Sequence, residues 1–513
     1  MVSSLEDSNL AQQDSNLRKK INESFKDWLS SSTSHGLPNI ARTDSKILKL
    51  LWTLSFLGSS AGCAYLLYLS VSSYLNYDVV TKITVYDELP SQFPTITICN
   101  SYPFGSANST PFLEQQLNKF FPEHDFKSLS NISSAEKKFN FQNFTFAKYL
   151  ILLSAADPSV SDDFKQSLGL SIEDMLINCQ YSGSACSKDD FVWFYSVFYG
   201  NCYMFNSGKN SSGGTVPLKY LNQAGKLNGL KLELYVGQSN KPFDCIMPST
   251  GVHLIINNYT VSSTVFDGLD APTSTETNIA VGRTLKYRLP YPYSGCIGDV
   301  YDESASDSFF FKAVVKSGKR YRASDCINLC LLRRINEVCG CYDINMQNVY
   351  NTRPCINLTD VNCDFGVFLD FFQRDIKQMC GPDCPVECDS ELLTYSTSSL
   401  EYPSEGYGNL LMNLREVKAK FGKDSVTFEE LKKSVLAVNL YYDDLKYTVI
   451  EESPSTDLIT LIAGMGGTLG LFIGVSFLSF VEIVEILIKI LFIYNEEKSK
   501  RPNRVFNLKK SNN

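Results

Sequence analysis

Residues Gly464–Ser476 read GMGGTLGLFIGVS and lie within an uncharged, largely apolar run from Leu458 to Val481. Each glycine costs about 1 kcal/mol of helix propensity relative to alanine, so a helix that only anchors a protein in lipid gains nothing from these glycines. A segment that breaks, packs closely against copies of itself and exposes main-chain carbonyls has a use for them. The stretch therefore predicts a membrane segment that lines a path for ions.

A second apolar run, from about Ile47 to Val71, lies near the N-terminus. Each run is long enough to cross a hydrocarbon core of roughly 30 Å as a helix, and the first begins too late for a cleavable signal peptide. Seven Lys or Arg residues lie between positions 18 and 49, and seven follow the second run. Because basic residues favour the cytosolic side, we expect both termini in the cytosol and residues 72–457 outside the cell.

Cysteines and glycosylation sequons agree with this topology. Fifteen of the 16 cysteines, all but Cys63, lie between residues 72 and 457, as expected in an oxidising compartment. The same segment contains the N-x-[ST] sequons of Asn108, Asn131, Asn143, Asn210, Asn258 and Asn357. We therefore expect a disulfide-bonded glycoprotein of the plasma membrane.

Charge and motifs exclude several classes of protein. The formal net charge is −8 although both tails are basic, so the middle segment is acidic, which suits cations and argues against a nucleic-acid partner. The chain has three histidines and lacks the GxxxxGK[ST], G-x-S-x-G and HExxH motifs. We expect no enzyme activity, no cofactor and no metal site.

The cysteine spacing predicts a stapled helical region. Cys326 and Cys330 are four residues apart, and Cys380, Cys384 and Cys388 repeat that spacing, so on helices the sulfur atoms share one face. Two antiparallel helices could then be bridged like a ladder. Zinc is the alternative, but the absence of a nearby histidine and the oxidising compartment favour disulfides. Spacing alone leaves the pairing open.

Four motifs, in their order along the chain, carry a family resemblance. They are Tyr77 followed by Thr81-Lys82, the block FPTITICN at Phe93–Asn100, GNCYMFNSG at Gly200–Gly208, and GLFIGVS at Gly470–Ser476 with glutamate downstream. Together they resemble the degenerin/epithelial sodium channel superfamily, particularly its acid-sensing and peptide-gated branches. The resemblance implies a homotrimer in membrane lipid, sodium as the permeant ion, and an amiloride-type pore blocker as a partner.

The implied fold class is an α+β membrane protein with two transmembrane helices flanking a large disulfide-rich extracellular domain. The expected parts are a cytosolic gating segment (1–46), a first transmembrane helix (47–71), the extracellular domain (72–457), a second transmembrane helix (458–493) and a cytosolic tail (494–513). Alternating strands at Val79–Val85, Leu230–Val236, Val252–Ile256, Leu285–Leu289 and Val435–Val449 would form a palm and β-ball. Helices would form a finger (about 110–178) and a thumb (about 296–395).

The resemblance also supplies the disulfide pairing that spacing leaves open. The implied pairs are Cys99–Cys202, Cys179–Cys186, Cys296–Cys388, Cys326–Cys384, Cys330–Cys380, Cys339–Cys363 and Cys341–Cys355. Cys245 is left over, and we expect it to be a free or buried thiol.

The pore is expected in the second span. Gly466, Gly470 and Gly474 recur every fourth residue, which by itself is typical of helix packing. The resemblance assigns the selectivity filter to Gly474, Val475 and Ser476. Glu482 and Glu485 follow with a spacing of three, so they share a helix face, and carboxylates at membrane depth indicate a wet one. We expect them to concentrate cations at the inner mouth.

Three further features are expected to act in gating. Ala463 falls at the family's degenerin position near the outer gate, although a core alanine is the alternative. His35 and Gly36 match the family's cytosolic His-Gly motif in a re-entrant loop below the pore. Tyr77 and Tyr293 occupy the places of an aromatic contact that couples the first span to the thumb, with tyrosine at Tyr293 where the family usually has tryptophan.

The stimulus is expected to be a peptide. Acid-sensing relatives carry histidines after the tyrosine that matches Tyr77, but here Asp78 and Val79 follow, and only His124 and His253 are extracellular histidines. An acidic, aromatic-rich domain suits a small cationic peptide containing Arg and Phe. The chain looks most like the FMRFamide-type peptide-gated sodium channels of invertebrates, with ligand-binding residues unknown.

Other interpretations remain open at this point. A proton-gated or a constitutively open sodium channel of the same superfamily is the first alternative. A scavenger-type lipid receptor has the same topology but needs no glycine-broken span, and an ATP-gated trimeric channel lacks the nested cysteine ladder. A non-conducting accessory subunit is a further possibility.

Overall fold

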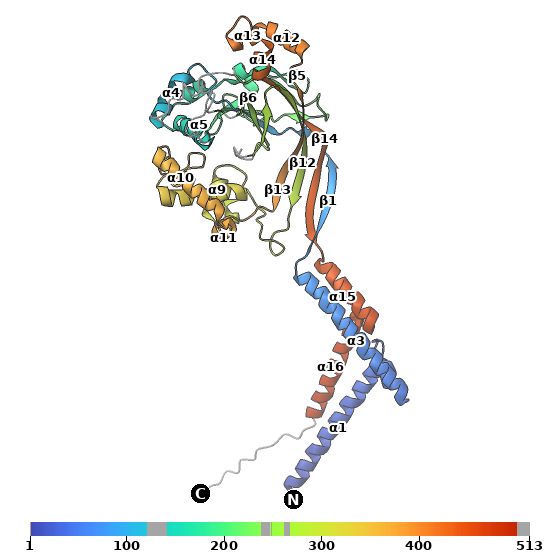
Figure 1. Cartoon of the computed structure of the whole chain (residues 1–513). Coiled ribbons are helices and arrows are strands. Elements are labelled where there is room, and N and C mark those ends of the chain that lie inside the picture. Colours follow the sequence, from blue (N-terminus) through green and yellow to red (C-terminus); the bar gives the residue numbers. More distant parts are fainter. Residues whose placement is uncertain (1, 121–140, 238–246, 248, 261–266, 500–513) are drawn as a thin grey trace, which may run out of the picture. The chain divides into compact units, whose positions relative to one another are not determined.

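The computed structural model describes residues 2–120, 141–237, 247, 249–260 and 267–499. The chain forms two compact units, which we describe separately (Figure 1). One unit combines residues 1–80 with residues 453–513, and the other contains residues 81–452.

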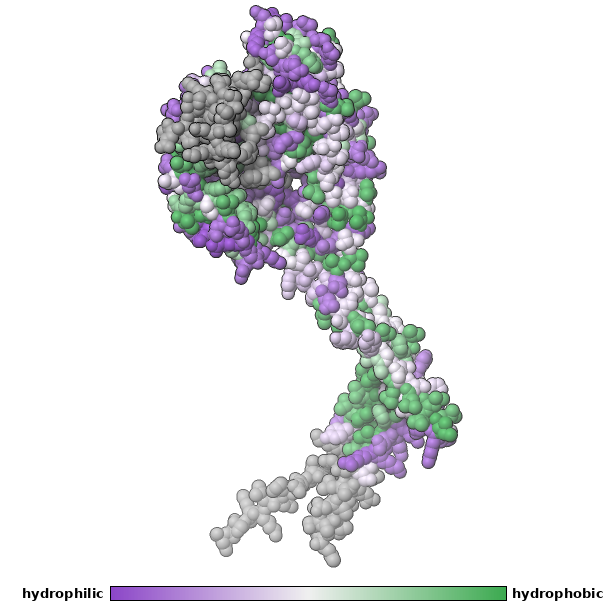
Figure 2. Space-filling model, in the orientation of Figure 1, coloured by the Kyte–Doolittle hydropathy of each residue, from purple (hydrophilic) through white to green (hydrophobic). Residues whose placement is uncertain are grey.

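The unit formed by the two ends of the chain is helical. Its helices are α1 (Val2–Ser31), α2 (Leu37–Arg42), α3 (Lys46–Leu75), α15 (Leu458–Ile473) and α16 (Phe477–Ser499). With 30 residues, α3 is about 45 Å long, more than the hydrocarbon core requires. Apolar side chains such as Ile47, which is 80% exposed, point away from the protein. Figure 2 shows hydrophobic residues gathered over this unit.

The second apolar run is interrupted, as its glycine-rich stretch predicts. Among the described residues, α3 is the one helix that is by itself long and apolar enough to cross a membrane. The helices α15 and α16 meet that condition only together, as a pair bent by 72°. The second apolar run is therefore two helices joined by a sharply bent break.

The larger unit is built on two β-sheets. Seven strands form the first, in the order β13-β12-β14-β9-β4-β5, with β1 also paired to β14. Their bounds are β1 Val79–Asp87, β4 Leu176–Tyr181, β5 Ser184–Ala185, β9 Leu230–Tyr235, β12 Thr275–Tyr287, β13 Asp389–Glu401 and β14 Val435–Pro454. The strands β12 and β14 are parallel, whereas β12 and β13 are antiparallel.

Five strands form the second sheet, and two short strands form a separate pair. The order is β11 (Leu269–Pro272), β10 (Gly251–Asn257), β3 (Thr95–Asn100), β7 (Gly200–Phe205) and β6 (Phe191–Ser196). A separate pair joins β2 (Ser91–Gln92) to β8 (Tyr220–Leu221). All six residues of the central strand β3 are buried.

The main core lies between the two sheets. Ile96 and Phe205 come from the five-stranded sheet, and Leu232 and Val438 come from the seven-stranded sheet. Each of these four side chains is at most 1% exposed. Burial of such side chains supplies the main favourable term of folding, so the two sheets form one unit.

Short helices occupy the region expected as the finger. They are α4 (Ser109–Phe120), α5 (Phe141–Ala156), α6 (Asp162–Leu168) and α7 (Ile172–Met175). Leu113 and Leu117 of α4 pack with Ile151 and Leu152 of α5 in a core of their own. Residues 121–140 lie outside the described part of the chain.

The region expected as the thumb contains α8 (Phe309–Lys316), α9 (Ala323–Cys339), α10 (Leu358–Gln373) and α11 (Ile376–Cys380). The structure contains seven disulfides, the same seven pairs that the family resemblance implies. They are Cys99–Cys202, Cys179–Cys186, Cys296–Cys388, Cys326–Cys384, Cys330–Cys380, Cys339–Cys363 and Cys341–Cys355. Cys245 lies outside the described residues, and Cys63 is free and buried in α3.

One expectation for this region is wrong. The ladder was expected to join two helices, but only α9 carries its cysteines on a continuous helix. Cys380 is the last residue of α11, and Cys384 and Cys388 follow in irregular structure. The reason is local, because Pro382 and Pro385 cannot continue a helix.

Two other segments differ from the sequence analysis. Residues 389–395, expected within the thumb, belong to β13 and pair with β12. The helices α12 (Glu405–Asn413), α13 (Arg415–Phe421) and α14 (Phe428–Ser434) were not predicted. A signal for α14 was present, since Thr427 and Glu430 form a capping box.

Candidate pore site

The break in the second span consists of three residues. Helix α15 ends at Ile473 and α16 begins at Phe477, so Gly474, Val475 and Ser476 lie between them. These are the residues that the sequence analysis proposed for the selectivity filter. The structure thus interrupts the helix at these three residues.

Glycine chemistry explains where α15 ends. Gly474 adopts a left-handed conformation with φ 71° and ψ 20°, which residues with a Cβ rarely adopt. Its N–H still donates to the Gly470 carbonyl at 3.1 Å, and the Val475 N–H donates to Leu469 at 3.3 Å. Within the described part of the chain, no donor reaches the carbonyl oxygens of Gly474 and Val475. Those two oxygens are available to a ligand.

The loop between α1 and α2 binds the end of α15. The Ile473 carbonyl accepts a hydrogen bond from the His35 N–H at 2.8 Å and another from the Ser34 hydroxyl at 3.2 Å. Since the last carbonyls of a helix have no partner within the helix, these donors replace the missing ones. The loop therefore caps α15 at the break.

The same loop also binds the start of α16. The Thr33 hydroxyl lies 2.8 Å from the Ser479 hydroxyl, and the Thr33 N–H donates to Oε2 of Glu482 at 3.2 Å. Ser479 in turn accepts a hydrogen bond from the Ser476 N–H at 3.0 Å. Residues 33–35 thus connect both half-helices across the break, and we call them the clamp loop.

His35 and Gly36 pack closely against neighbouring helices. A Cβ on Gly474 would lie 2.5 Å from Cγ of His35, so the imidazole lies directly against the break. Gly36 has a φ of 99°, and a Cβ there would lie 3.1 Å from the Phe56 ring of α3. Both glycines therefore fit positions that a larger residue would strain.

Helix α3, the first span, packs on α15 close to the break. A Cβ on Gly62 of α3 would lie 3.1 Å from the Phe472 ring, and the neighbouring Cys63 is 1% exposed. Phe472 is the second-last residue of α15, so the first span supports the helix end next to the break.

The two acids below the break have different surroundings. Glu482 accepts the clamp-loop hydrogen bond, whereas Glu485 forms an ion pair with Lys489 one turn later at 2.6 Å. Both members of that pair are about 60% exposed. The lysine offsets the charge of Glu485, so the two acids are not the equivalent pair that their spacing suggested.

Helix α15 presents small residues on its surface. Ala463 is exposed on α15, so it is not a core alanine of this chain. A Cβ on Gly466 or Gly470 would meet no atom of the described chain within 4 Å. This face of α15 is unoccupied in a single chain.

The expected coupling tyrosines belong to different units. Tyr77 lies in residues 1–80, after α3, and has a left-handed φ of 56°. Tyr293 lies in the unit of residues 81–452. Their contact therefore stays a prediction.

The sequons differ in their surroundings. Asn108 and Asn357 are exposed, and Asn210 stands in a turn where its Oδ1 accepts a hydrogen bond from the Gly214 N–H. Asn258 is half-buried and uses Nδ2, the atom that carries a glycan, to bind Glu391 at 2.7 Å. Asn131 and the side chain of Asn143 lie outside the described part.

Two histidines, His124 and His253, were expected outside the cell. His253 is 6% exposed, and its ring nitrogens lie 2.8 Å from Asp270 and 3.1 Å from the Asp267 carbonyl. His124 lies outside the described residues. In the part of the chain that the structure describes, no cluster of side chains suits a metal ion.

Sequence reasoning missed the clamp loop. It singled out His35 and Gly36, but not Thr33 and Ser34, whose hydroxyls bind residues about 440 positions away. The run of hydroxyl residues from Ser30 to Ser34 was a signal, because such side chains often satisfy free backbone groups. Their partners could not be read from the sequence.

Comparisons with known proteins agree with these features. A family model described as amiloride-sensitive sodium channel matches residues 28–486. The FMRFamide-activated amiloride-sensitive sodium channel of Cornu aspersum is 25% identical, over 94% of this chain and 86% of that protein. The bile acid-sensitive ion channel of Mus musculus is 24% identical, over 91% and 87%. The gamma subunit of the Xenopus laevis epithelial sodium channel is 27% identical, over 64% and 47%.

Proposed function

Because the chain belongs to the amiloride-sensitive sodium channel family, whose members are ion channels and not enzymes, we propose that it is a subunit of a sodium-selective channel opened by an extracellular peptide. Sodium permeation follows from the family. The peptide as stimulus is the finer part of the proposal. The observation that supports the pore is the three-residue break in the second span. Two of its carbonyl oxygens accept no hydrogen bond from any described residue.

In the proposed pore, three copies of the chain each contribute Gly474, Val475 and Ser476 to a constriction. Main-chain oxygens replace part of the water around Na⁺, as carbonyl rings do in selectivity filters. The clamp loop keeps these oxygens in place from the cytosolic side by its hydrogen bonds to both half-helices. Glu482 and Glu485 raise the cation concentration at the inner mouth, with Glu482 the stronger contributor because Lys489 pairs with Glu485.

The remaining elements take the roles that the family resemblance implies. Ala463 forms the outer gate, where small side chains let three helices close together, and Tyr77 and Tyr293 couple the extracellular domain to the first span. The trimer lies in the plasma membrane with both termini in the cytosol, and an amiloride-type blocker enters from outside.

Two observations support a peptide as the stimulus. A relative covering most of the chain is named for activation by FMRFamide. The described extracellular histidine, His253, is buried and bound to Asp270 and to a carbonyl, so its ring is not poised at the surface. Other relatives are named for bile acids, so the experiment must include more than one stimulus.

Recording from oocytes that express the chain alone tests this function. FMRFamide is expected to open an inward sodium current that amiloride blocks, and replacing Ser476 with leucine is expected to change the Na⁺/K⁺ permeability ratio. Current evoked by acid or bile acid but not by peptide would refute the ligand. Steady amiloride-sensitive current without ligand would indicate a constitutively open channel, and no current at all would indicate an accessory subunit.

A further inference from the structure

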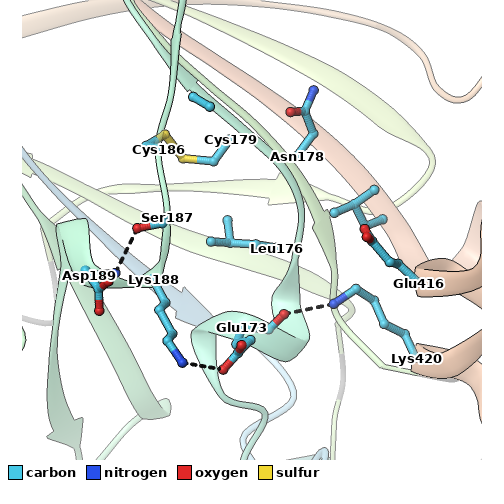
Figure 3. A pocket seen from close by; sticks show the side chains of 12 residues that line it. Glu173, Leu176, Asn178, Cys179, Cys186, Ser187, Lys188, Asp189, Glu416 and Lys420 are labelled. Carbon is cyan, nitrogen blue, oxygen red and sulfur yellow. Dashed lines mark hydrogen bonds and ion pairs between the residues drawn. A yellow bond between two sulfur atoms is a disulfide. The ribbon is translucent and has the colours of Figure 1, made fainter.

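A cleft in the unit of residues 81–452 lies far in sequence from the candidate pore. It has a volume of about 590 Å³, within the range of small-ligand sites. Its floor comes from α7 and the first half of β4. One wall comes from the hairpin that the Cys179–Cys186 disulfide closes together with the 3-10 helix η2 (Lys188–Asp190) that follows it, and the other wall from α13 (Figure 3).

Covalent and polar contacts hold the walls in place. The Lys420 ammonium of α13 donates to the carbonyls of Glu173 and Asp174 at 2.9 and 2.8 Å, which ties that wall to α7. The Lys188 ammonium of η2 pairs with the Glu173 carboxylate at 3.1 Å. Both lysines of the cleft, and one of its three carboxylates, are therefore already engaged.

Two further carboxylates line the cleft. Asp189 stands on the hairpin wall and Glu416 on the α13 wall, on opposite sides in Figure 3. Within the described residues neither carboxylate forms a hydrogen bond or a close ion pair, although Asp189 interacts electrostatically with Lys188 and Glu416 with Lys420. With three carboxylates against two lysines, the cleft carries one excess negative charge.

The floor between these carboxylates combines apolar side chains with an open strand edge. A register shift in the pairing of β4 with β9 at Ile177 brings both Leu176 and Ile177 to the lining. On its other side, β4 pairs with β5 only at Gln180 and Tyr181. Residues 176–178 therefore have no strand beside them on that side in the described chain, and an extended peptide can pair with such an edge.

We propose that this cleft binds the peptide of the proposed function, with the guanidinium of its arginine between Asp189 and Glu416 and an adjacent aromatic ring on Leu176 and the disulfide. The inference rests on the proposed function for the identity of the ligand. The binding chemistry is that of a planar cation between two carboxylates, which forms strong, charge-assisted hydrogen bonds. Apolar contact with the floor adds area removed from water.

The test is a binding measurement that does not depend on gating. Fluorescently labelled FMRFamide and its citrulline analogue, in which the arginine is replaced by a neutral isostere, are titrated against the full-length chain in detergent. Wild type is expected to bind the arginine peptide about tenfold or more tightly than the citrulline peptide. In Glu416→Gln with Asp189→Asn, the two peptides should bind alike.

Glu429→Gln is the matched control, because Glu429 is an exposed acid on the neighbouring helix α14 and does not line the cleft. It should keep the wild-type preference for arginine. The proposal would be overturned if replacing arginine by citrulline weakened peptide binding equally in wild type and in the double variant. It would also be overturned if wild type bound neither peptide. Binding with the expected pattern but without current would uphold the cleft and refute peptide gating.

Discussion

Two helical regions of this chain are interrupted, and they are held in different ways. In the thumb region, α11 ends at Cys380, and five of the seven disulfides lie between Cys296 and Cys388. In the second span, α15 ends at Ile473, and four hydrogen bonds from the clamp loop join the two half-helices. One interruption is covalently fixed and the other can be rearranged.

Disulfides and hydrogen bonds contribute different amounts to stability, and this difference indicates how rigid each region is. A disulfide contributes roughly 2–4 kcal/mol to stability by restricting the unfolded chain. A typical hydrogen bond contributes only about 0.5–1.5 kcal/mol net, because water competes for both partners. The stapled region therefore suits a rigid element that transmits force, whereas the clamped break suits a site with two states of similar free energy.

The largest effect on channel current is expected from a substitution of Gly474, the first residue of the break. Replacing Gly474 with valine adds a Cβ that would lie 2.5 Å from His35 and forces a β-branched residue into a left-handed conformation. We expect the channel current to fall to background while the protein still reaches the cell surface. Patch-clamp recording with surface biotinylation measures both.

Gly58→Ala is the control for this prediction. Gly58 is an exposed helical glycine of α3 whose added Cβ meets no described atom within 4 Å, so current should persist. Normal current in Gly474→Val would show that the break does not depend on this conformation.

Removing one covalent rung should cost stability rather than conduction. In Cys330→Ser with Cys380→Ser, we expect the free energy of unfolding to fall by about 2–4 kcal/mol and the Tm of the detergent-purified chain to fall with it. Scanning fluorimetry measures the Tm. Cys63→Ser, which removes a thiol outside any disulfide, is the control, and an equal Tm in both proteins would contradict the assignment of rigidity to the rungs.

A buried carboxylate makes the stapled region sensitive to pH. Burial, and then the neighbouring carboxylate of Asp343, raise the pKa of Asp364 on α10 to about 8. Burial also raises the pKa of Asp343 and, together with these two acids, that of Tyr149 on α5. Because the folded-state pKa of Asp364 exceeds its unfolded value of about 4, stability should fall as the pH rises from about 4 to about 8.

Asp364→Asn tests this dependence. The variant should lose part of the decrease in Tm that wild type shows between pH 5 and pH 8, because the amide does not ionise whereas the buried Asp343 still does. Asp370→Asn is the control, since Asp370 lies on the same helix but is half-exposed and paired with Arg374. A wild-type Tm that is constant over this range would contradict the prediction.

The smallest effect is expected at one bond of the clamp loop. Thr33→Val keeps the side-chain shape but removes the hydrogen bond to Ser479, so the balance between open and closed channels should shift by up to about tenfold. Single-channel open probability is the measurement. Thr33→Val and Ser479→Ala should be non-additive when combined, because they remove the same bond.

Ser31→Ala is the control for the clamp loop. Among the described residues, the Ser31 hydroxyl bonds only within its own helix, to the carbonyls of Asp27 and Trp28. Additive effects of Thr33→Val and Ser479→Ala would show that the loop does not act through this contact. The comparison between a fixed and a rearrangeable interruption would then fail.

Much of the architecture could be predicted because it depends on local patterns. Alternation placed β9, β10 and β14 within a few residues of their observed bounds, and the family resemblance implied every disulfide found. The second cysteine-bearing helix was wrong because regular spacing was given more weight than Pro382 and Pro385. Helices α12, α13 and α14 were missed because they are short and lie between strong strand signals.

In the candidate pore site, too, some features depend on local sequence and others on tertiary contacts. The sequence by itself indicated that the glycine-rich second span would be interrupted, since helix propensity is a local property, and the family resemblance pointed to Gly474. Only the tertiary structure decided what binds that interruption, because Ile473 and Ser479 meet residues 33–35 through contacts that span about 440 positions. The cleft between the hairpin and α13 has the same origin: its walls come from segments more than 200 residues apart, and no periodicity in the sequence records that they meet.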